Sequence, residues 1–324
     1  MGLEGRTRHV EVLMRSKRLF LAAMAAGICL RAAAAGTISY DYIQIDYPGA
    51  ADTYVYGMND QRQVVGYYDT SGGTVSGFLW SNGVFTQLDY PGSLSTYAFG
   101  ISNDGSVVGY YILSSGTYGF LYNLSTSSLT IGPQGTTVRA VNNNDQVLAH
   151  PSGTPNYDIG ALGGSLSQLA TYPGAASTTY RGINSSGSAT GWFTDAGNAT
   201  HAFLYSGGSF VAIPCAATST AYGMNDSATV ALLSGTDQNY LYSGGSCIAL
   251  SFPPGANFMQ VEAVNNGGDF GGLLGLPGDD SYHGFIALVT PEPATAGLAL
   301  IGLLACAALW NRERNPKTRG NTGN

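Results

Sequence analysis

The stretch YGMNDQRQVVGYY, residues 56–68, decides the fold, because copies of it return along the chain. The next copy ends in the same letters, V-V-G-Y-Y, and four fainter copies follow it. They start at 57, 100, 140, 182, 223 and 263, with steps of 40 to 43 residues. Six copies at a near-constant period indicate one repeat architecture. The later copies are GISNDGSVVGYY (100–111), AVNNNDQVLAH (140–150), GINSSGSATGWF (182–193), GMNDSATVALL (223–233) and AVNNGGDFGGL (263–273).

Each repeat contains two further shared segments. A Phe-Leu element such as SGFLW (76–80) follows the copy, and a strand-like piece ending in Tyr-Pro-Gly, such as FTQLDYPG (85–92), lies between units. Pro-Gly favours a turn with proline in its second position and a glycine that supplies positive φ. The first element recurs at 118–122, 201–205, 239–242 and 283–287, and the second at 42–49, 166–174 and 247–255.

Each period therefore holds about four short segments, which the Asn, Asp and Gly turns between them predict to be strands. Four strands in roughly forty residues is the size of one β-propeller blade. We predict an all-β domain over 36–290, with a six-bladed β-propeller as the preferred architecture. A β-solenoid is the alternative, because repeats of this length also stack linearly. A closed ring is preferred, since neither end of the array carries a distinct polar capping unit.

Positive charge is concentrated at the two ends of the 324-residue chain. Between 36 and 290, only Arg62, Arg139 and Arg181 stand against sixteen acidic residues, a formal charge of −13. A body with this charge repels phosphate backbones, which argues against a nucleic-acid partner.

The N-terminus has the order of parts of a secretory signal peptide. Basic residues precede the apolar run LFLAAMAAGICL (19–30), and the small residues of RAAAAG follow it, so we predict cleavage after Ala35. Either Met1 or Met14 can be the initiator, because a start at Met14 gives a more ordinary signal peptide. A permanent anchor or buried helix is the alternative, although the apolar run is short for a bilayer span.

The C-terminus predicts a membrane-spanning helix stopped by positive charge. Pro291, Glu292 and Pro293 precede an apolar run over 294–310 and four basic residues. This order resembles the PEP-CTERM sorting signal of bacteria that secrete exopolysaccharide. The resemblance implies an exosortase-type protease as partner, transient residence in the inner membrane, and release to the cell surface or the biofilm matrix. A plain C-terminal anchor is the alternative.

The repeat body resembles the extracellular HAF repeat family, named for a His-Ala-Phe tripeptide. His201-Ala202-Phe203 matches the tripeptide, and His283-Gly284-Phe285 nearly does. The recurring V-V-G-Y-Y and D-Y-P-G segments are in the same style. This family has no established activity, so the resemblance implies an extracellular location and a repeat architecture.

Export also bears on the cysteines. Cys215 and Cys247 are the only pair outside the terminal segments. An oxidising compartment permits a disulfide between them, and sequence spacing alone leaves open whether they are bonded.

Asn59 and Asp60, within the opening stretch, could be read as calcium ligands. The aligned positions hold Ser102 and Asn103, and later asparagines and serine, so only the ability to cap a turn is kept. We therefore predict an Asx-type turn, with Gly57 and Gly66 marking bends at the ends of the stretch.

No catalytic, cofactor or metal site is predicted. The histidines His150, His201 and His283 are widely spaced, which excludes a zinc motif, and the last two share a repeat position that favours a hydrogen bond to a turn. Asp46 and Asp89 also recur at one position, before Tyr-Pro-Gly, which favours turn capping over a glycosidase pair.

We therefore expect an exported, non-enzymatic binding or structural module that contacts exopolysaccharide. A propeller-type glycan hydrolase or lyase is the alternative. The two differ in asymmetry: an enzyme concentrates polar residues that do not repeat in one or two loops, whereas this sequence places its polar residues on turns common to several units, which favours binding.

Overall fold

The computed structural model describes residues 38–290 as strands and turns. Over these residues no helix is long and apolar enough to cross a membrane. The predicted signal peptide with its cleavage site at Ala35 and the predicted sorting segment from Pro291 onward lie outside the described residues. The strands are β1 (Ser39–Ile45), β2 (Asp52–Met58), β3 (Val64–Asp69), β4 (Val75–Ser81), β5 (Val84–Gln87), β6 (Ser95–Ile101), β7 (Ser106–Leu113), β8 (Gly116–Asn123), β9 (Ser128–Gln134), β10 (Thr136–Val141), β11 (Gln146–Pro151), β12 (Asp158–Ala161), β13 (Leu166–Gln168), β14 (Ser177–Ile183), β15 (Ala189–Thr194), β16 (Thr200–Ser206), β17 (Ser209–Ala212), β18 (Ser219–Met224), β19 (Val230–Ser234), β20 (Asn239–Ser243), β21 (Ser246–Ala249), β22 (Phe258–Val264), β23 (Phe270–Gly275) and β24 (Tyr282–Thr290).

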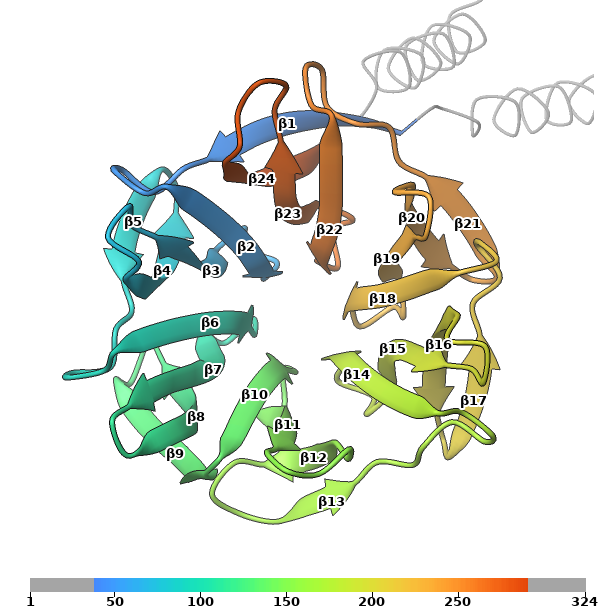
Figure 1. Cartoon of the computed structure of the whole chain (residues 1–324), viewed down its shortest axis with the longest axis horizontal. Helices are drawn as coiled ribbons and strands as arrows, with labels where there is room; N and C mark the ends of the chain where they lie inside the picture. The colour runs from blue at the N-terminus through green and yellow to red at the C-terminus, as the bar shows by residue number, and fades with distance from the viewer. Residues whose placement is uncertain (1–37, 291–324) are drawn as a thin grey trace, which may run out of the picture. The chain divides into compact units, whose positions relative to one another are not determined.

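The strands form six antiparallel blades of four, arranged in a ring (Figure 1). Blades 1 to 5 follow chain order, from β2–β5 to β18–β21, and one parallel pair between Val75 and Ser95 joins blades 1 and 2. Strands β2, β6, β10, β14, β18 and β22 lie innermost and converge on the centre (Figure 1). The predicted six-unit, all-β propeller is thus what the chain forms.

The ring closes within blade 6, where β1 from the start of the body pairs with β24 from its end. Ser39 Oγ lies 2.6 Å from Thr290 Oγ1, and both Gln44 and Asp46 contact His283. Because residue numbers rise along β1 as they fall along β24, the two strands run antiparallel. This closure excludes the β-solenoid alternative.

A closed circle of hydrogen bonds links the six turns that follow the innermost strands. In each blade the backbone N–H of one turn residue donates to the side-chain oxygen of its equivalent in the next blade, at 2.7 to 3.4 Å. The last bond runs from Asn266 of blade 6 back to Asp60 of blade 1, at 2.8 Å. The residues of this turn ring are Asp60, Asn103, Asn143, Ser185, Asp226 and Asn266.

Asn59 confirms the predicted Asx-type turn. Its Oδ1 accepts the backbone N–H groups of Gln61 at 3.1 Å and of Gln63 at 2.9 Å. Its Nδ2 donates to the carbonyl of Ser102 in the next blade at 3.2 Å. In the described chain no three His, Cys, Asp or Glu side chains gather as a metal would require.

The valines of V-V-G-Y-Y divide between two interblade cores. Val64 packs with Val55 and Ile286 on one face of blade 1, whereas Val65 packs with Ala98 and Val107 of blade 2. Successive side chains of a strand point to opposite faces, so one strand supplies both cores.

Gly57 and Gly66 do not mark bends, contrary to the prediction. Both lie inside strands, β2 and β3, and neither has a positive φ. A Cβ on Gly66 would lie 1.8 Å from the carbonyl oxygen of Tyr54, and one on Gly57 would lie 2.9 Å from the backbone of Gly100. These glycines are required because neighbouring backbones approach closely. The positive φ predicted for the glycines of the Tyr-Pro-Gly turns is confirmed at Gly49, Gly92 and Gly174.

Candidate functional site

A β-bulge interrupts the pairing of the first two strands at the same place in every blade. In blade 1 the register shifts between Val55 and Gly57, which leaves Tyr56 as the extra residue. Bulges turn a side chain away from the direction that regular pairing would give it. In blade 5 the shift spans Tyr222 and Gly223. The first unpaired residues of the six blades, together called the bulge ring, are Tyr56, Phe99, Arg139, Arg181, Tyr222 and Glu262.

All six residues of the bulge ring line one cavity of about 80 Å³ at the centre of the propeller. The positions around them repeat: a glycine or alanine follows, then isoleucine, methionine or valine. The bulge ring does not repeat. It holds two of the three arginines and the single glutamate of residues 38–290.

The two arginines come from adjacent blades and lie against aromatic rings. The Arg139 guanidinium is 4.6 Å from the ring centre of Phe99, and that of Arg181 is 5.7 Å from Tyr222. Neither side chain forms a hydrogen bond or ion pair with another described residue, and Arg181 Nε is buried. Burial, followed by repulsion from Arg181, lowers the pKa of Arg139. The cavity therefore holds two guanidinium groups whose N–H donors have no acceptor among the described residues.

Glu262 is buried, with 5% of its surface exposed, and accepts a hydrogen bond from Gln260 Nε2. Burial raises the pKa of its carboxyl, while Arg181 and Arg139 act in the opposite direction. Even with Glu262 ionised, the bulge ring keeps a net positive charge within a body of formal charge −13.

Tyrosine hydroxyls add neutral donors. The hydroxyl oxygens of Tyr56 and Tyr67 lie 3.4 Å apart. Burial raises the pKa of Tyr56 to about 12, and burial also raises the pKa values of Tyr110 and Tyr222. These phenols therefore keep their protons at neutral pH and can donate hydrogen bonds.

The turn ring lies beyond one end of this cavity, where most of its residues line a second cavity of about 60 Å³. Asn143 Nδ2 donates to Asp226 Oδ2 at 2.8 Å, and Asn266 Nδ2 lies within reach of both Asp60, at 2.9 Å, and Asp226, at 3.2 Å. The first of these bonds crosses from blade 3 to blade 5, which are not neighbours, whereas the other two join blade 6 to its neighbours, blades 1 and 5. The Asn143–Asp226 bond spans the centre at the turn-ring end, which favours approach of a ligand to the bulge ring from the opposite end.

The residues selected from sequence take structural positions. His201 contacts Asp195 and His283 contacts Asp279, each on an adjacent turn, at 3.0 and 3.1 Å, which matches the predicted shared role. Asp89 Oδ1 accepts the N–H of Gly77 at 3.1 Å. His150 Nε2 lies 3.1 Å from the carbonyl of Thr154, away from the other histidines.

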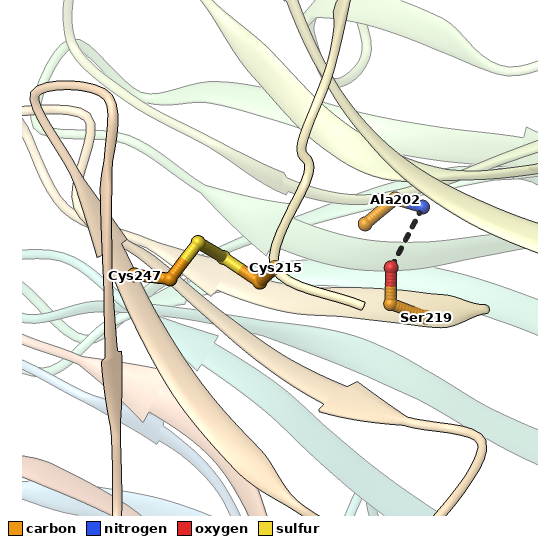
Figure 2. Close-up of a disulfide and its surroundings, with 4 residues drawn as sticks. All are labelled: Ala202, Cys215, Ser219 and Cys247. Atoms are coloured by element: carbon orange, nitrogen blue, oxygen red, sulfur yellow. Dashed lines mark hydrogen bonds between the residues drawn. A yellow bond between two sulfur atoms is a disulfide. The ribbon is translucent and has the colours of Figure 1, made fainter. Parts of the chain in front are cut away.

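Cys215 and Cys247 are joined by a disulfide in the structure (Figure 2). The bond ties the segment before β18 to the outermost strand of blade 5, β21. Nearby, the backbone N–H of Ala202 donates to Ser219 Oγ at 3.3 Å and links blade 4 to blade 5 (Figure 2).

The bulge ring was not selected from sequence. A signal for it exists: when the six copies are aligned, the residue before the glycine or alanine changes between aromatic, cationic and acidic side chains. That residue lies just outside most of the recognised copies, and propensity does not predict a bulge.

No family model and no curated protein matches the chain. Solved structures share the fold at low identity. AofleA from Arthrobotrys oligospora is 10% identical over 78% of this chain and 87% of that one, with a TM-score of 0.50. The virginiamycin B lyase of Staphylococcus aureus is 12% identical over 79% and 89%, with a TM-score of 0.43. The lectin of Aleuria aurantia, described as a six-bladed β-propeller, is 13% identical over 79% and 98%, with a TM-score of 0.43.

Proposed function

We propose that the chain is an exported, non-enzymatic surface or matrix protein whose propeller binds a carboxylate-bearing sugar in its central cavity. Pro291, Glu292 and Pro293 support sorting by an exosortase-type protease. The single observation that carries the binding role is the pair of arginines, Arg139 and Arg181, which have no hydrogen-bonding anion among residues 38–290.

Leaving a guanidinium group half-buried and unpaired is unfavourable, since desolvated donors lose their bonds to water. A carboxylate restores those bonds, because its two oxygens match the fork of guanidinium donors. The aromatic rings of Tyr56 and Tyr222 provide faces on which a sugar ring can stack.

The volume of the central cavity limits which part of a ligand can enter it. One water needs about 10–15 Å³ on a comparable measure, so a cavity of about 80 Å³ has room for a few waters or one carboxylate group. Because the Asn143–Asp226 bond spans the centre at the turn-ring end, it obstructs a polymer that would thread through. We therefore propose recognition of a terminal acidic residue of a glycan.

Calorimetric titration of the full chain with glucuronate, and with glucose as the neutral match, tests the binding role. Arg181→Met and Arg139→Met should each weaken glucuronate binding about tenfold or more, because each removes a charge-assisted hydrogen bond. Arg62→Met changes a cation outside the cavity and should leave the affinity unchanged. Equal affinity for glucose, or unchanged affinity in both cavity variants, contradicts the proposal.

Export and sorting have their own test. Mass spectrometry of the protein from its native host should show cleavage after Ala35 and loss of the segment that follows Pro293. An intact C-terminal segment on the mature protein contradicts sorting, whatever the titration shows.

A glycan lyase is the second candidate, and Glu262 is the observation that favours it. A buried carboxyl with a raised pKa is typical of proton-transferring groups, and the asymmetry expected of an enzyme is present in the bulge ring. A hydrolase is less favoured, because glycosidases pair two carboxyls and Glu262 is the only one lining the cavity.

Incubation with uronate-containing polymers, monitored by the ultraviolet absorbance of unsaturated products, separates a lyase from a binding module. The binding proposal predicts no product for the natural chain. Product that disappears in Glu262→Gln, a variant of the same shape, would establish the lyase instead.

A further inference from the structure

Blades 1, 2 and 4 share an aromatic pair at their interblade faces. The tyrosine of each Tyr-Pro-Gly turn stacks on a ring from the second strand of the following blade. Tyr47 stacks on Tyr68, Tyr90 on Tyr111, and Tyr172 on Phe193, with ring centres 3.6, 3.9 and 3.7 Å apart.

In blades 1 and 4 a third ring is wedged between this pair and the core. Phe85 lies 5.0 Å from Tyr47 and 5.4 Å from Phe78. Phe210 lies 5.0 Å from Tyr172 and 5.1 Å from Phe203. Each wedged phenylalanine comes from the outermost strand of its blade.

Strand register identifies the equivalent residue in the other blades. Phe85 pairs with Trp80 and Phe210 pairs with Tyr205. In blade 5 the corresponding residue is Cys247, which pairs with Tyr242 and is bonded to Cys215, so a disulfide fills the position there.

In blade 2 the wedged phenylalanine is missing. Its outermost strand places Leu129 opposite Tyr122, and this leucine is 44% exposed. A cavity of about 330 Å³ remains at the interblade face, lined by Tyr90 and Phe120, the equivalents of the two rings that hold Phe85 in blade 1. Blade 2 therefore has the two aromatic rings that contact the phenylalanine in blade 1, but it has a leucine at the position of that phenylalanine.

The cavity has a polar side. Gln87 and Asp89 line it together with the apolar side chains of Leu88, Val107 and Leu124. Asp89 Oδ1 accepts one N–H, from Gly77 at 3.1 Å, and Gln87 Nε2 donates to its Oδ2, so each carboxylate oxygen retains a lone pair. A donor carried on the ligand ring can bond there.

We propose that this interblade cavity binds a small molecule with one six-membered aromatic ring and a hydrogen-bond donor on that ring. The protein's own phenyl groups at the two equivalent sites specify the ring, and the carboxylate of Asp89 specifies the donor. A cavity of about 150 Å³ with apolar walls already accepts benzene, so space for the ring and its substituent is sufficient. This site is separate from the central cavity and does not depend on the function proposed for it.

Phenol is the probe that matches this description, and cyclohexanol is its non-aromatic match. Titration of the full chain followed by calorimetry or NMR should give one phenol site with at least tenfold preference over cyclohexanol. Leu129→Phe supplies the missing wedge, so it should weaken phenol binding at least tenfold and raise the melting temperature.

The reciprocal variant, Phe85→Leu, opens the equivalent space in blade 1 and should raise the stoichiometry from one phenol to two. Phe210→Leu makes the same test in blade 4 if Phe85→Leu does not fold. Arg181→Met, in the central cavity, should leave phenol binding unchanged. Undetectable phenol binding to the natural chain, or unchanged binding to a folded Leu129→Phe variant, overturns the proposal.

Discussion

The bulge ring, on the six innermost strands, and the turn ring, in the turns that follow them, obey opposite rules. The turn ring repeats a short polar residue in every blade, and each member accepts a backbone hydrogen bond from its neighbour. The bulge ring, a few residues earlier on each strand, holds aromatic, cationic and acidic side chains in turn, and its arginines lack hydrogen-bonding partners among the described residues. In a repeat protein, positions that repeat maintain the architecture, and positions that depart from it are free to bind.

The largest expected effect comes from removing the space that the bulge requires. Gly66→Ala places a methyl group 1.8 Å from the Tyr54 carbonyl oxygen, so the bulge in blade 1 cannot keep its geometry. We expect a loss of about 4 kcal/mol or more in unfolding free energy, measured by urea denaturation.

Gly72→Ala is the matched control, because its Cβ would meet only Thr70 Oγ1, at an ordinary 3.6 Å. Its effect should stay within about 0.5 kcal/mol. Equal stability of the two variants would show that the close approach at Gly66 relaxes easily.

The next effect concerns the turn ring. Asp226→Ala removes the acceptor for Ser185 N–H, at 2.8 Å, and for Asn143 Nδ2. We expect about 2–3 kcal/mol of destabilisation in chemical denaturation, since donors to a charged acceptor are left unpaired. Asp280→Ala, in an exposed turn, should have little effect.

The pH dependence of Asp226 has a defined sign. Burial alone would raise the pKa of its carboxyl, but hydrogen bonds, led by those from Ser185, lower it overall. A lowered pKa in the folded state means that the contribution is present at neutral pH and is lost as pH falls through that lowered value. Acid denaturation should show a smaller pH dependence in Asp226→Asn than in the natural chain.

Arginines inside and outside the bulge ring should respond to substitution with opposite signs. Arg181→Met removes an unpaired guanidinium and should stabilise the free protein by about 1 kcal/mol. Arg62→Met breaks a 2.9 Å ion pair with Asp269, whose side chain is buried, and should destabilise it. Thermal unfolding of both variants tests this contrast, and a loss of stability in Arg181→Met would show that the bulge ring is structural.

The smallest expected effect is the pH dependence of carboxylate binding. Burial raises the pKa of Glu262, so as pH rises through that value the cavity gains a negative charge facing Arg139, Arg181, Tyr56 and Tyr222. Glucuronate affinity should therefore fall severalfold as pH rises, and Glu262→Gln should remove this dependence. Titrations above the pKa of the ligand carboxyl isolate the effect.

Sequence predicted what local chemistry determines. The repeat period predicted six units, and the Tyr-Pro-Gly segments predicted turns with positive φ at glycine. The Asx-type turn at Asn59 was also predicted correctly. Sequence did not predict what depends on pairing across strands. Gly57 and Gly66 were misread because close backbone approach leaves no local signature.

Two sites followed only from register. Tyr56 and its equivalents became a ring of cavity residues once the bulges were placed. The empty wedge at Leu129 is visible only when outermost strands are aligned through their partners, since the spacing of blade 2 differs from that of blade 1.

The pairing of β1 with β24, here called the clasp, means that the ring can close only near the end of synthesis. Ser39 contacts Thr290, which lies 251 residues later in the chain. Blade 6 therefore stays incomplete until nearly the whole body has left the ribosome. Trimming beyond Thr290 would leave the clasp whole, whereas a cut within β24 would expose a free strand edge and open the ring. The cleavage proposed after Pro293 would thus lie only a few residues from a cut that opens the ring.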